Sequence, residues 1–481
     1  MTLFHPFSTL SLSFLFSILL SNVVVSYQQD YETVPALNSA EQEAVYRVLD
    51  SVNSGIPWRS LFPDDLCSSA PHGVVCSYFS DSAAPNSPVT AVHVTELSFG
   101  YVSDNTPNPP CAADAALSPL LFTSFKFLRK LFFYKCFNHS TPVSFPDDVA
   151  AVGTAATTLE ELVFVDNPSF VGSLCGILRN FTSLRRVVLT GNGVYGPIPE
   201  FVGGLVNLEE LTLSRNQLSG EIPLGLAELK NLKVLDLSQN FFTGNVPSTM
   251  GYNLSELLKL DLSSNGFSGK IPDSFGALKK LQFLDLSFNR FGNFRVPMFL
   301  SEMTKLKEVY LSGNHLGGRI PEVWEHLGNV LRIGFSDMGL EGNIPASMGV
   351  FLRNLSYLGL DNNKLEGTVP QEFGLLESVG EINLENNSLS GRVFFPSSNF
   401  SRIGHTLKLG GNPGLCVDDE VFCSAENGNN NTKNASFGHL KLCKKEPQRP
   451  NPVPLEESSS SAQVFPDSMF VFLGLLILLN F

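Results

Sequence analysis

The stretch LKVLDLSQN, residues 232–240, has the form L-x-x-L-x-L-x-x-N. The same form recurs in LEELTLSRN, LLKLDLSSN, LQFLDLSFN, LKEVYLSGN, LSYLGLDNN and VGEINLENN, which begin at Leu208, Leu257, Leu281, Leu306, Leu355 and Val379. The asparagine slot falls at positions 167, 192, 216, 240, 265, 289, 314, 338, 363, 387 and 412, so every step is 24 or 25 residues. A fixed period of this length predicts a solenoid of stacked, equivalent coils.

The pattern also predicts how each coil is built. The leucines point inward from one short strand per coil and stack on their equivalents in the next coil, while the x positions face solvent on a concave sheet. The asparagine amide can donate and accept, so it can satisfy the backbone where the chain leaves the strand. A G-x-I-P step follows in the coils at Gly196, Gly220, Gly269, Gly318 and Gly342, where glycine permits an unusual turn and proline fixes φ. The predicted fold class is an α/β repeat, a right-handed leucine-rich-repeat solenoid over residues 91–412 with about 11–13 repeats.

Three places depart from the pattern. Met338 takes an asparagine slot, which predicts a locally dry turn. Cys175 takes the proline slot in GSLCG. NRFGNFRVP carries one extra residue between Asn289 and Pro297, which predicts a small local bulge.

The ends of a solenoid need covers, because their last apolar layer would face water. SAEQEAVYRVLDSV, within a predicted N-terminal cap of residues 27–90, offers a capping box of Ser39 and Gln42. Its apolar residues recur at helical spacing and predict a helix laid over the first coil: Ala44, Val45, Val48, Leu49 and Val52. Residues 413–443 form the predicted C-terminal cap.

The L-x-G-x-I-P repeats resemble the plant-specific leucine-rich-repeat class found in receptor kinases, receptor-like proteins and cell-wall inhibitors. The stretches LFFYKCF, NPSFVG and SDMGLEG are similar to plant receptor-like proteins without a kinase, of the Piriformospora indica-insensitive protein 2 type and related to TOO MANY MOUTHS. The resemblance implies disulfide-bonded caps, and we expect the pairs Cys67–Cys76, Cys111–Cys136 and Cys416–Cys443. Cys175 and Cys423 are then left over, and Cys423 could replace either C-terminal partner.

Residues 1–26 have the pattern of a secretory signal, with an apolar run from Leu10 to Leu20 and small residues before Tyr27. The alternative is a buried N-terminal helix. Export makes the cysteines disulfide candidates and gives meaning to eight glycosylation sequons. These begin at Asn138, Asn180, Asn253, Asn354, Asn386, Asn399, Asn430 and Asn434.

The C-terminal region predicts attachment to a membrane. Residues 444–463 read as a Pro/Ser-rich stalk and residues 464–481 as a hydrophobic anchor signal. The apolar run from Met469 is shorter than the roughly 20 residues that span a bilayer. Small residues, a spacer and this tail fit a glycosylphosphatidylinositol signal with Ser458 as the attachment site. The alternative is a retained tail helix that starts nearer Val464. Both interpretations place the protein at the extracellular face of the plasma membrane.

Composition and motifs exclude several classes of function. A net charge of -14 argues against nucleic acid as a partner. The sequence carries no metalloprotease, hydrolase, P-loop or dinucleotide motif, so we predict no catalytic residue, cofactor or metal. Asp236, Asp261 and Asp285 recur with the repeat, and we expect them to form a solvated ladder on the concave face.

The best candidate ligand-binding residues are aromatic or arginine side chains predicted at exposed strand slots of four consecutive coils: Phe283, Phe288, Tyr310, Arg332 and Tyr357. These residue types are enriched at interaction hot spots. The alternative is ordinary surface scatter, or shielding by a glycan at Asn354 or Asn386.

The predicted function is that of a cell-surface receptor-like protein. It would bind an extracellular peptide or a receptor-kinase ectodomain, as a co-receptor or signalling modulator in plant development or in the response to microbes. The alternative is a cell-wall inhibitor of a microbial polygalacturonase-like enzyme.

Overall fold

The structure is a computed structural model that describes residues 35–69, 71, 73–80, 89–100, 108–138, 141–145, 158–179, 181–395, 403, 405–418 and 440–444. The predicted signal peptide, stalk, anchor signal and Ser458 lie outside the described residues, as do Cys423 and the sequons at Asn180, Asn399, Asn430 and Asn434. In the described part of the chain, no helix is both long and apolar enough to cross a membrane.

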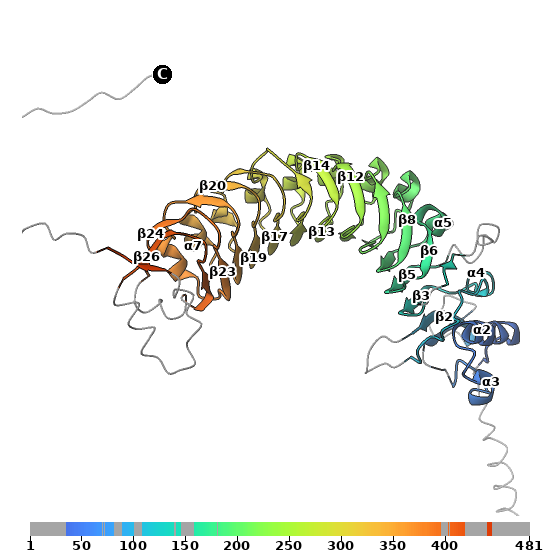
Figure 1. The fold of residues 1–481 in the computed structure, drawn as a ribbon. Coiled ribbons are helices and arrows are strands. Elements are labelled where there is room, and N and C mark those ends of the chain that lie inside the picture. Colours follow the sequence, from blue (N-terminus) through green and yellow to red (C-terminus); the bar gives the residue numbers. More distant parts are fainter. Residues whose placement is uncertain are drawn as a thin grey trace, which may run out of the picture. The chain divides into compact units, whose positions relative to one another are not determined.

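One strand from each coil joins a 14-stranded sheet that runs through the repeats in sequence order. Its strands are β1 (Val74–Ser80), β2 (Val89–Phe99), β3 (Lys130–Tyr134), β5 (Glu161–Val165), β7 (Arg186–Thr190), β9 (Glu210–Thr212), β11 (Val234–Asp236), β13 (Lys259–Asp261), β15 (Phe283–Asp285), β17 (Glu308–Tyr310), β19 (Arg332–Gly334), β21 (Tyr357–Gly359), β23 (Glu381–Asn383) and β25 (Leu407–Lys408). Only the β1–β2 pair is antiparallel among these strands. Figure 1 shows the sheet along the inner, concave side of the repeat unit.

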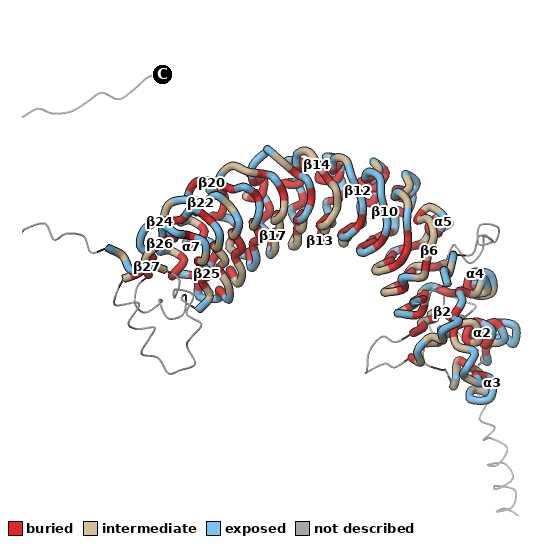
Figure 2. Tube along the Cα trace, viewed as in Figure 1, coloured by how far each residue is buried: buried red, intermediate tan, exposed pale blue. Residues whose placement is uncertain are grey.

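The leucine ladder forms the core as the repeat predicts. Leu235, Leu260 and Leu284 are direct partners on adjacent parallel strands, and each is at most 1% exposed. Figure 2 shows the inward-facing side of each coil buried and the outer turns exposed. Because neighbouring coils bury each other's apolar side, the fold is a leucine-rich-repeat solenoid, as predicted.

The asparagine slot both donates and accepts. Asn240 donates through Nδ2 to the carbonyl oxygens of Leu213 and Leu237, at 2.8 and 3.1 Å, and accepts the Leu218 N–H at 3.0 Å. The side chain therefore ties each coil to the one before it. Met338, which replaces the asparagine once, is 1% exposed, in agreement with a dry turn.

A second set of strands lies on the lateral side of the coils. A seven-stranded sheet has the order β16-β14-β12-β10-β8-β6-β4, and two three-stranded sheets have the orders β18-β20-β22 and β24-β26-β27. The bounds are β4 (Val143–Ser144), β6 (Phe170–Ser173), β8 (Gly193–Gly196), β10 (Gln217–Gly220), β12 (Phe241–Asn245), β14 (Gly266–Gly269), β16 (Arg290–Phe291), β18 (Gly318–Arg319), β20 (Leu340–Asn343), β22 (Lys364–Glu366), β24 (Ser390–Arg392), β26 (Gly414–Val417) and β27 (Lys441–Leu442).

Short helices complete the coils. They are α5 (Leu174–Leu178), η3 (Glu200–Gly204), η4 (Leu224–Glu228), α6 (Thr249–Asn253), η5 (Asp273–Ala277), η6 (Met298–Glu302), η7 (Trp324–His326), α7 (Ser347–Phe351) and η8 (Gln371–Leu375). Several begin directly after the proline of the G-x-I-P step, as η4 does after Pro223. Proline suits this position, because its fixed φ is compatible with a helix start and it has no N–H to satisfy.

The N-terminal cap contains helices α2 (Ser39–Val52) and α3 (Trp58–Leu61), and helix α4 (Leu120–Thr123) follows between β2 and β3. The predicted apolar residues of α2 are all buried. The capping-box prediction is wrong, because Asn38 is the N-cap and its Oδ1 accepts the Ala40 N–H at 2.9 Å. Gln42 turns away from the helix start and bonds the loop at Asp64 and Leu66 instead.

Disulfides hold the N-terminal cap together. The structure forms Cys67–Cys76 and Cys111–Cys136, with Cα atoms 5.6 and 5.0 Å apart. Cys416 and Cys443 are both disulfide-bonded, and their pairing with each other stays a prediction. Cys175 on α5 is a free thiol. The described sequon asparagines are exposed, and their glycosylation also stays a prediction: Asn138, Asn253, Asn354 and Asn386.

Candidate ligand-binding surface

Four of the five candidate residues lie on consecutive strands of the concave sheet. Phe283 is on β15, Tyr310 on β17, Arg332 on β19 and Tyr357 on β21. Arg332 is the direct partner of Tyr357, and Glu308 of β17 is the direct partner of both Phe283 and Arg332. Because neighbouring strands are about 4.8 Å apart, this register brings the side chains into contact range.

The side chains form one connected set of contacts. The rings of Phe283 and Tyr310 are 5.9 Å apart between centroids. Arg332 Nε donates to the Tyr310 hydroxyl at 2.8 Å, and that hydroxyl donates to Glu308 Oε2 at 2.7 Å. The Arg332 guanidinium lies 4.9 Å from the Tyr357 ring centroid, within cation–π range. We call Phe283, Glu308, Tyr310, Arg332 and Tyr357 the aromatic patch.

Glu308 was missed by sequence reasoning, although it occupies a strand slot in LKEVYLSGN. Its role becomes visible only when the repeats are aligned by register, which makes it the neighbour of an aromatic residue on one side and of an arginine on the other. Because an ionised carboxylate can only accept, Glu308 makes the Tyr310 hydroxyl a hydrogen-bond donor.

Phe288 is not part of the aromatic patch. The prediction of a strand slot is wrong for this residue, because β15 ends at Asp285 and Phe288 lies in the following turn. Its φ is 54° and its side chain is 62% exposed. The ring packs over Gly313, where an added Cβ would meet Phe288 Cδ1 at 2.6 Å.

Two glycines let the tyrosine rings lie against the sheet. A Cβ on Gly334 would meet Tyr310 Cδ1 at 2.7 Å, and a Cβ on Gly359 would meet the Tyr357 hydroxyl at 2.7 Å. Gly334 lies in LRIGFS and Gly359 in LSYLGLD. In the other coils, the same strand slot carries a side chain. The missing side chains leave room for flat aromatic surfaces, which suits contact with a ligand laid along the sheet.

Burial and hydrogen bonding keep Tyr310 protonated. The pKa of Tyr310 is raised to about 12, chiefly by burial and next by the bond to the Glu308 carboxylate, while the Arg332 guanidinium acts in the opposite direction. The hydroxyl is therefore a neutral donor over the whole physiological range. It holds the Arg332 side chain, which is 46% exposed, in a fixed place on the surface.

The aspartate row beside the patch is not a solvated ladder, and that prediction is wrong. Asp236 is buried, and the side chains of Asp236 and Asp261 are only 10% and 13% exposed. The Oδ1 atom of each aspartate accepts bonds from the N–H and hydroxyl of the serine two residues on, as Asp236 does from Ser238 at 3.1 and 2.7 Å. The row therefore serves the turn after each strand. The described residues contain no group of histidine, cysteine or acidic side chains that could hold a metal ion.

Lys259 joins the aspartate row to the aromatic patch. Its Nζ lies 2.7 Å from Asp236 and 3.8 Å from Asp261, and also 5.3 Å from the Phe283 ring centroid. Burial alone would lower the pKa of Lys259, but the bond to Asp236 raises it overall. A permanent cation therefore borders one side of the patch.

The concave face is different in the earlier coils. There the equivalent column contains a ladder of ion pairs, in which Glu161 bonds Lys130 at 3.0 Å and Arg186 bonds Glu210 at 2.8 Å. Charges that satisfy one another across strands stabilise the sheet and need no ligand. The earlier coils also carry an aromatic pair, Phe132 and Tyr134 of β3, but in the aromatic patch large, partly exposed rings enter the column that holds these ion pairs.

Family models support the repeat assignment. A "Leucine rich repeat" model matches residues 230–291, a "Leucine Rich repeats (2 copies)" model matches residues 206–247, and a further "Leucine Rich Repeat" model matches residues 305–327 and 354–376.

Three of the curated relatives come from Arabidopsis thaliana. Protein TOO MANY MOUTHS is 35% identical over 35% of this chain and 26% of its own length. Receptor like protein 29 is 34% identical over 34% of this chain and 32% of its own length, and Piriformospora indica-insensitive protein 2 is 32% identical over 34% and 35%. The matched region spans about a third or less of the length of these relatives.

Solved structures of plant receptors share the fold. The Arabidopsis receptor kinase HAESA, solved in complex with the peptide hormone IDA and the co-receptor SERK1, is 28% identical with a TM-score of 0.52, over 63% of this chain and 56% of that chain. A TDR receptor is 26% identical with a TM-score of 0.50, over 63% and 54%. The chain therefore has the leucine-rich-repeat fold and is similar, over about a third of its length, to plant receptor-like proteins.

Proposed function

We propose that the protein is a cell-surface recognition protein that binds an extracellular peptide or a receptor-kinase ectodomain through the aromatic patch. It would act as a co-receptor or signalling modulator, in plant development or in the response to microbes. The observation that carries the proposal is the unbroken contact from Phe283 through Tyr310 and Arg332 to Tyr357 across four coils.

The chemistry of the patch supports binding rather than catalysis. Tyrosine and arginine contribute large contact areas and are enriched at hot spots. The tyrosine rings and the arginine are held by contacts within the patch, so a ligand orders few side chains on binding. The related receptor kinase HAESA was solved with a peptide hormone and a co-receptor bound, which supports partners of the same kind for this chain.

The proposal is tested by binding of the ectodomain to a panel of receptor-kinase ectodomains, measured by biolayer interferometry. We expect at least one partner to bind, and Phe283→Ala with Tyr310→Ala to weaken that binding at least tenfold. Loss of two central aromatic contacts of about 1–2 kcal/mol or more each would produce such an effect.

The matched control is Phe241→Ala, which removes an aromatic side chain that is 65% exposed on β12, outside the patch. Unchanged affinity of the double variant, with the control also unchanged, would remove the patch from consideration. A microbial polygalacturonase belongs in the same panel, because binding and inhibition of that enzyme alone would favour the cell-wall inhibitor instead.

We propose further that the protein reaches the extracellular face of the plasma membrane through a cleaved signal peptide and a glycosylphosphatidylinositol anchor at Ser458. Treatment of intact cells with phosphatidylinositol-specific phospholipase tests the anchor. Release of the protein into the supernatant, abolished by changing the attachment serines, is the expected outcome. Persistence in the membrane fraction would favour a retained tail helix.

A further inference from the structure

The lateral sheet is interrupted in the middle of the solenoid. The seven-stranded sheet ends at β16 and a separate sheet begins at β18 in the next coil. Only an isolated bridge between Gly292 and His315 and a few irregular backbone bonds, such as Arg295 N–H to the Leu316 carbonyl at 3.1 Å, connect the described residues of the two coils here. The interruption coincides with the extra residue of NRFGNFRVP.

The sequence explains the interruption. In the coils before and after, the residue that opens the G-x-I-P step is glycine in the left-handed region, with φ of 76° at Gly269 and 73° at Gly318. Phe294 takes that place in FRVP, and a residue with a Cβ is strained at such a φ. Asn293 and Arg295 adopt φ of 61° and 66° instead, so the chain follows a different path around Phe294.

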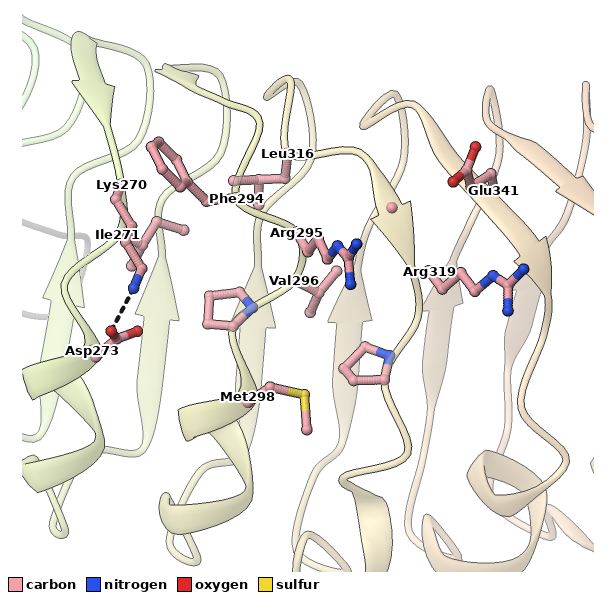
Figure 3. A pocket seen from close by; sticks show the side chains of 13 residues that line it. Lys270, Ile271, Asp273, Phe294, Arg295, Val296, Met298, Leu316, Arg319 and Glu341 are labelled. Atoms are coloured by element: carbon pink, nitrogen blue, oxygen red, sulfur yellow. Dashed lines mark hydrogen bonds and ion pairs between the residues drawn. The ribbon is translucent and has the colours of Figure 1, made fainter.

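The altered path opens a groove of about 640 Å³ between adjacent coils. Ile271, Val296 and Leu316 line the bottom of the groove but are buried, so the apolar surface open to a ligand lies mainly on the rim. Its rim carries Phe294 and Met298, which are 51% and 63% exposed. Figure 3 shows these side chains around the groove.

Three consecutive coils carry a cation at the second position of the G-x-I-P step or its FRVP variant: Lys270, Arg295 and Arg319. All three line the groove. Lys270 forms an ion pair with Asp273, whereas Arg295 and Arg319 form no ion pair among the described residues. Glu341, which also lines the groove, is the direct strand partner of Arg319. Figure 3 shows the two arginines on neighbouring coils. Like charges on adjacent coils do not stabilise a sheet, so the fold itself does not require this arrangement.

The aliphatic parts of Arg295 and Arg319 pack against glycines of the next coil. A Cβ on Gly318 would meet Arg295 Cγ at 2.7 Å, and a Cβ on Gly342 would meet Arg319 Cγ at 3.1 Å. Each aliphatic stem therefore lies over a glycine of the next coil, and the guanidinium heads stay available to a ligand.

We propose that this groove is a second binding site, which takes an extended peptide segment with a carboxylate beside an aliphatic side chain. The aliphatic group packs on Phe294 and Met298 at the rim, and the carboxylate accepts hydrogen bonds from Arg295 and Arg319. With Lys270 paired to Asp273, Arg295 and Arg319 outnumber the remaining acid of the groove, Glu341, and this local excess of positive charge on a chain of net charge -14 favours an acidic ligand. A peptide fits better than an acidic sugar, because sugar hydroxyls packed on Phe294 and Met298 would lose their hydrogen bonds.

The site is separate from the aromatic patch, because its residues lie on the lateral side and the patch lies on the long sheet. The proposal therefore stands or falls independently of the function proposed above.

A display selection tests the proposal with random peptides as the probe. The peptides are selected on the wild-type ectodomain and then depleted on Arg295→Glu/Arg319→Glu. Peptides that bind only the wild type are expected to carry Asp or Glu next to Leu, Ile, Met or Phe. A synthetic version of the most enriched peptide is then measured by fluorescence polarisation.

Matched variants give the expected magnitudes. We expect the double arginine variant, and the peptide with its acid changed to the amide, each to weaken binding at least tenfold, and higher salt to weaken it further. Lys230→Glu/Lys305→Glu makes the same charge change at two exposed lysines away from the groove and should leave affinity within about twofold. Unchanged thermal unfolding shows that each variant is folded.

Three results would overturn the proposal. The first is a selection that yields no peptide sensitive to the double arginine variant. The second is a set of sensitive peptides without acidic residues. The third is binding of soluble oligogalacturonate that depends on Arg295 and Arg319 while no acidic peptide is enriched, because the ligand would then be a sugar.

Discussion

Single polar residues in this solenoid are buried because the repeat gives each of them backbone partners. Asn240 is 7% exposed and satisfies groups in its own coil and in the one before it. The ionised form of Asp285 is less well stabilised by its surroundings. Its carboxylate accepts two bonds from Ser287, but burial and the carboxylates of Asp261 and Asp236 oppose its ionisation.

Asp285 should therefore make stability depend on pH. Burial raises its pKa from 3.8 to about 6 in the folded chain. Because the folded pKa lies above the unfolded value, the contribution of Asp285 to stability is fully present below pH 4, is lost as the pH rises to about 6, and changes little above that. Asp285→Asn removes this penalty, which is at most about 3 kcal/mol at neutral pH. We expect the variant to raise the Tm at pH 7.5 and to change it little at pH 4.5.

Asp273→Asn is the matched control, because Asp273 is an exposed aspartate on η5. Thermal unfolding of both variants between pH 4.5 and 7.5 provides the comparison. A Tm difference between Asp285→Asn and the wild type that does not vary with pH would contradict the assignment.

At the scale of elements, helix α2 closes the first coil with a buried acid. Glu41 is 8% exposed, and its carboxylate accepts the Val94 N–H of β2 at 3.0 Å and contacts His93 Nδ1 at 2.9 Å. Glu41→Ala leaves a buried N–H without its acceptor, which costs about 1–3 kcal/mol. We expect lower stability in denaturant unfolding and faster hydrogen exchange in β2.

The same helix offers the control. Glu43 lies away from the sheet contact and pairs with Arg47 and Arg59 on the surface. Glu43→Ala should leave unfolding almost unchanged, because exposed ion pairs contribute little. If the two variants behaved alike, the bond from Glu41 to β2 would not be what holds the helix on the coil.

Elements that depend on the repeat alone were predictable. The inward leucines, the asparagine turns and the apolar face of α2 follow from local periodicity, because each repeat makes the same contacts with its neighbours. The helix start was missed by one residue, since Asn38 and Ser39 are both good caps and only the structure shows which side chain bonds the helix.

Features that depend on register between coils were harder to predict. The strands are only three residues long in this region, so Phe288 falls in a turn although it lies near the strand in sequence. The burial of Asp236 depends on the serine and lysine around it, which a single repeat does not reveal. The extra residue near Phe294 predicted a bulge, but the groove arises from its two neighbouring coils together.

At the scale of the whole repeat unit, each described strand of the long sheet pairs with its immediate neighbours. The strand partners of β13 are β11 and β15, and the same holds along the sheet. In such an array, stability is a sum of terms within coils and between adjacent coils. Damage to one coil should therefore spread only a short distance before the next interfaces compensate.

Leu260→Ala tests this property, because Leu260 is fully buried at the centre of β13 and packs between Leu235 and Leu284. The cavity should cost about 2–5 kcal/mol. Hydrogen exchange measured by mass spectrometry should then accelerate in β11, β13 and β15, while β3 and β5 keep their protection. Val206→Ala, at a residue 58% exposed outside the leucine ladder, controls for the loss of a side chain at the surface. Equal acceleration in every coil would mean that the solenoid unfolds as one cooperative body, and the nearest-neighbour description of its stability would be wrong.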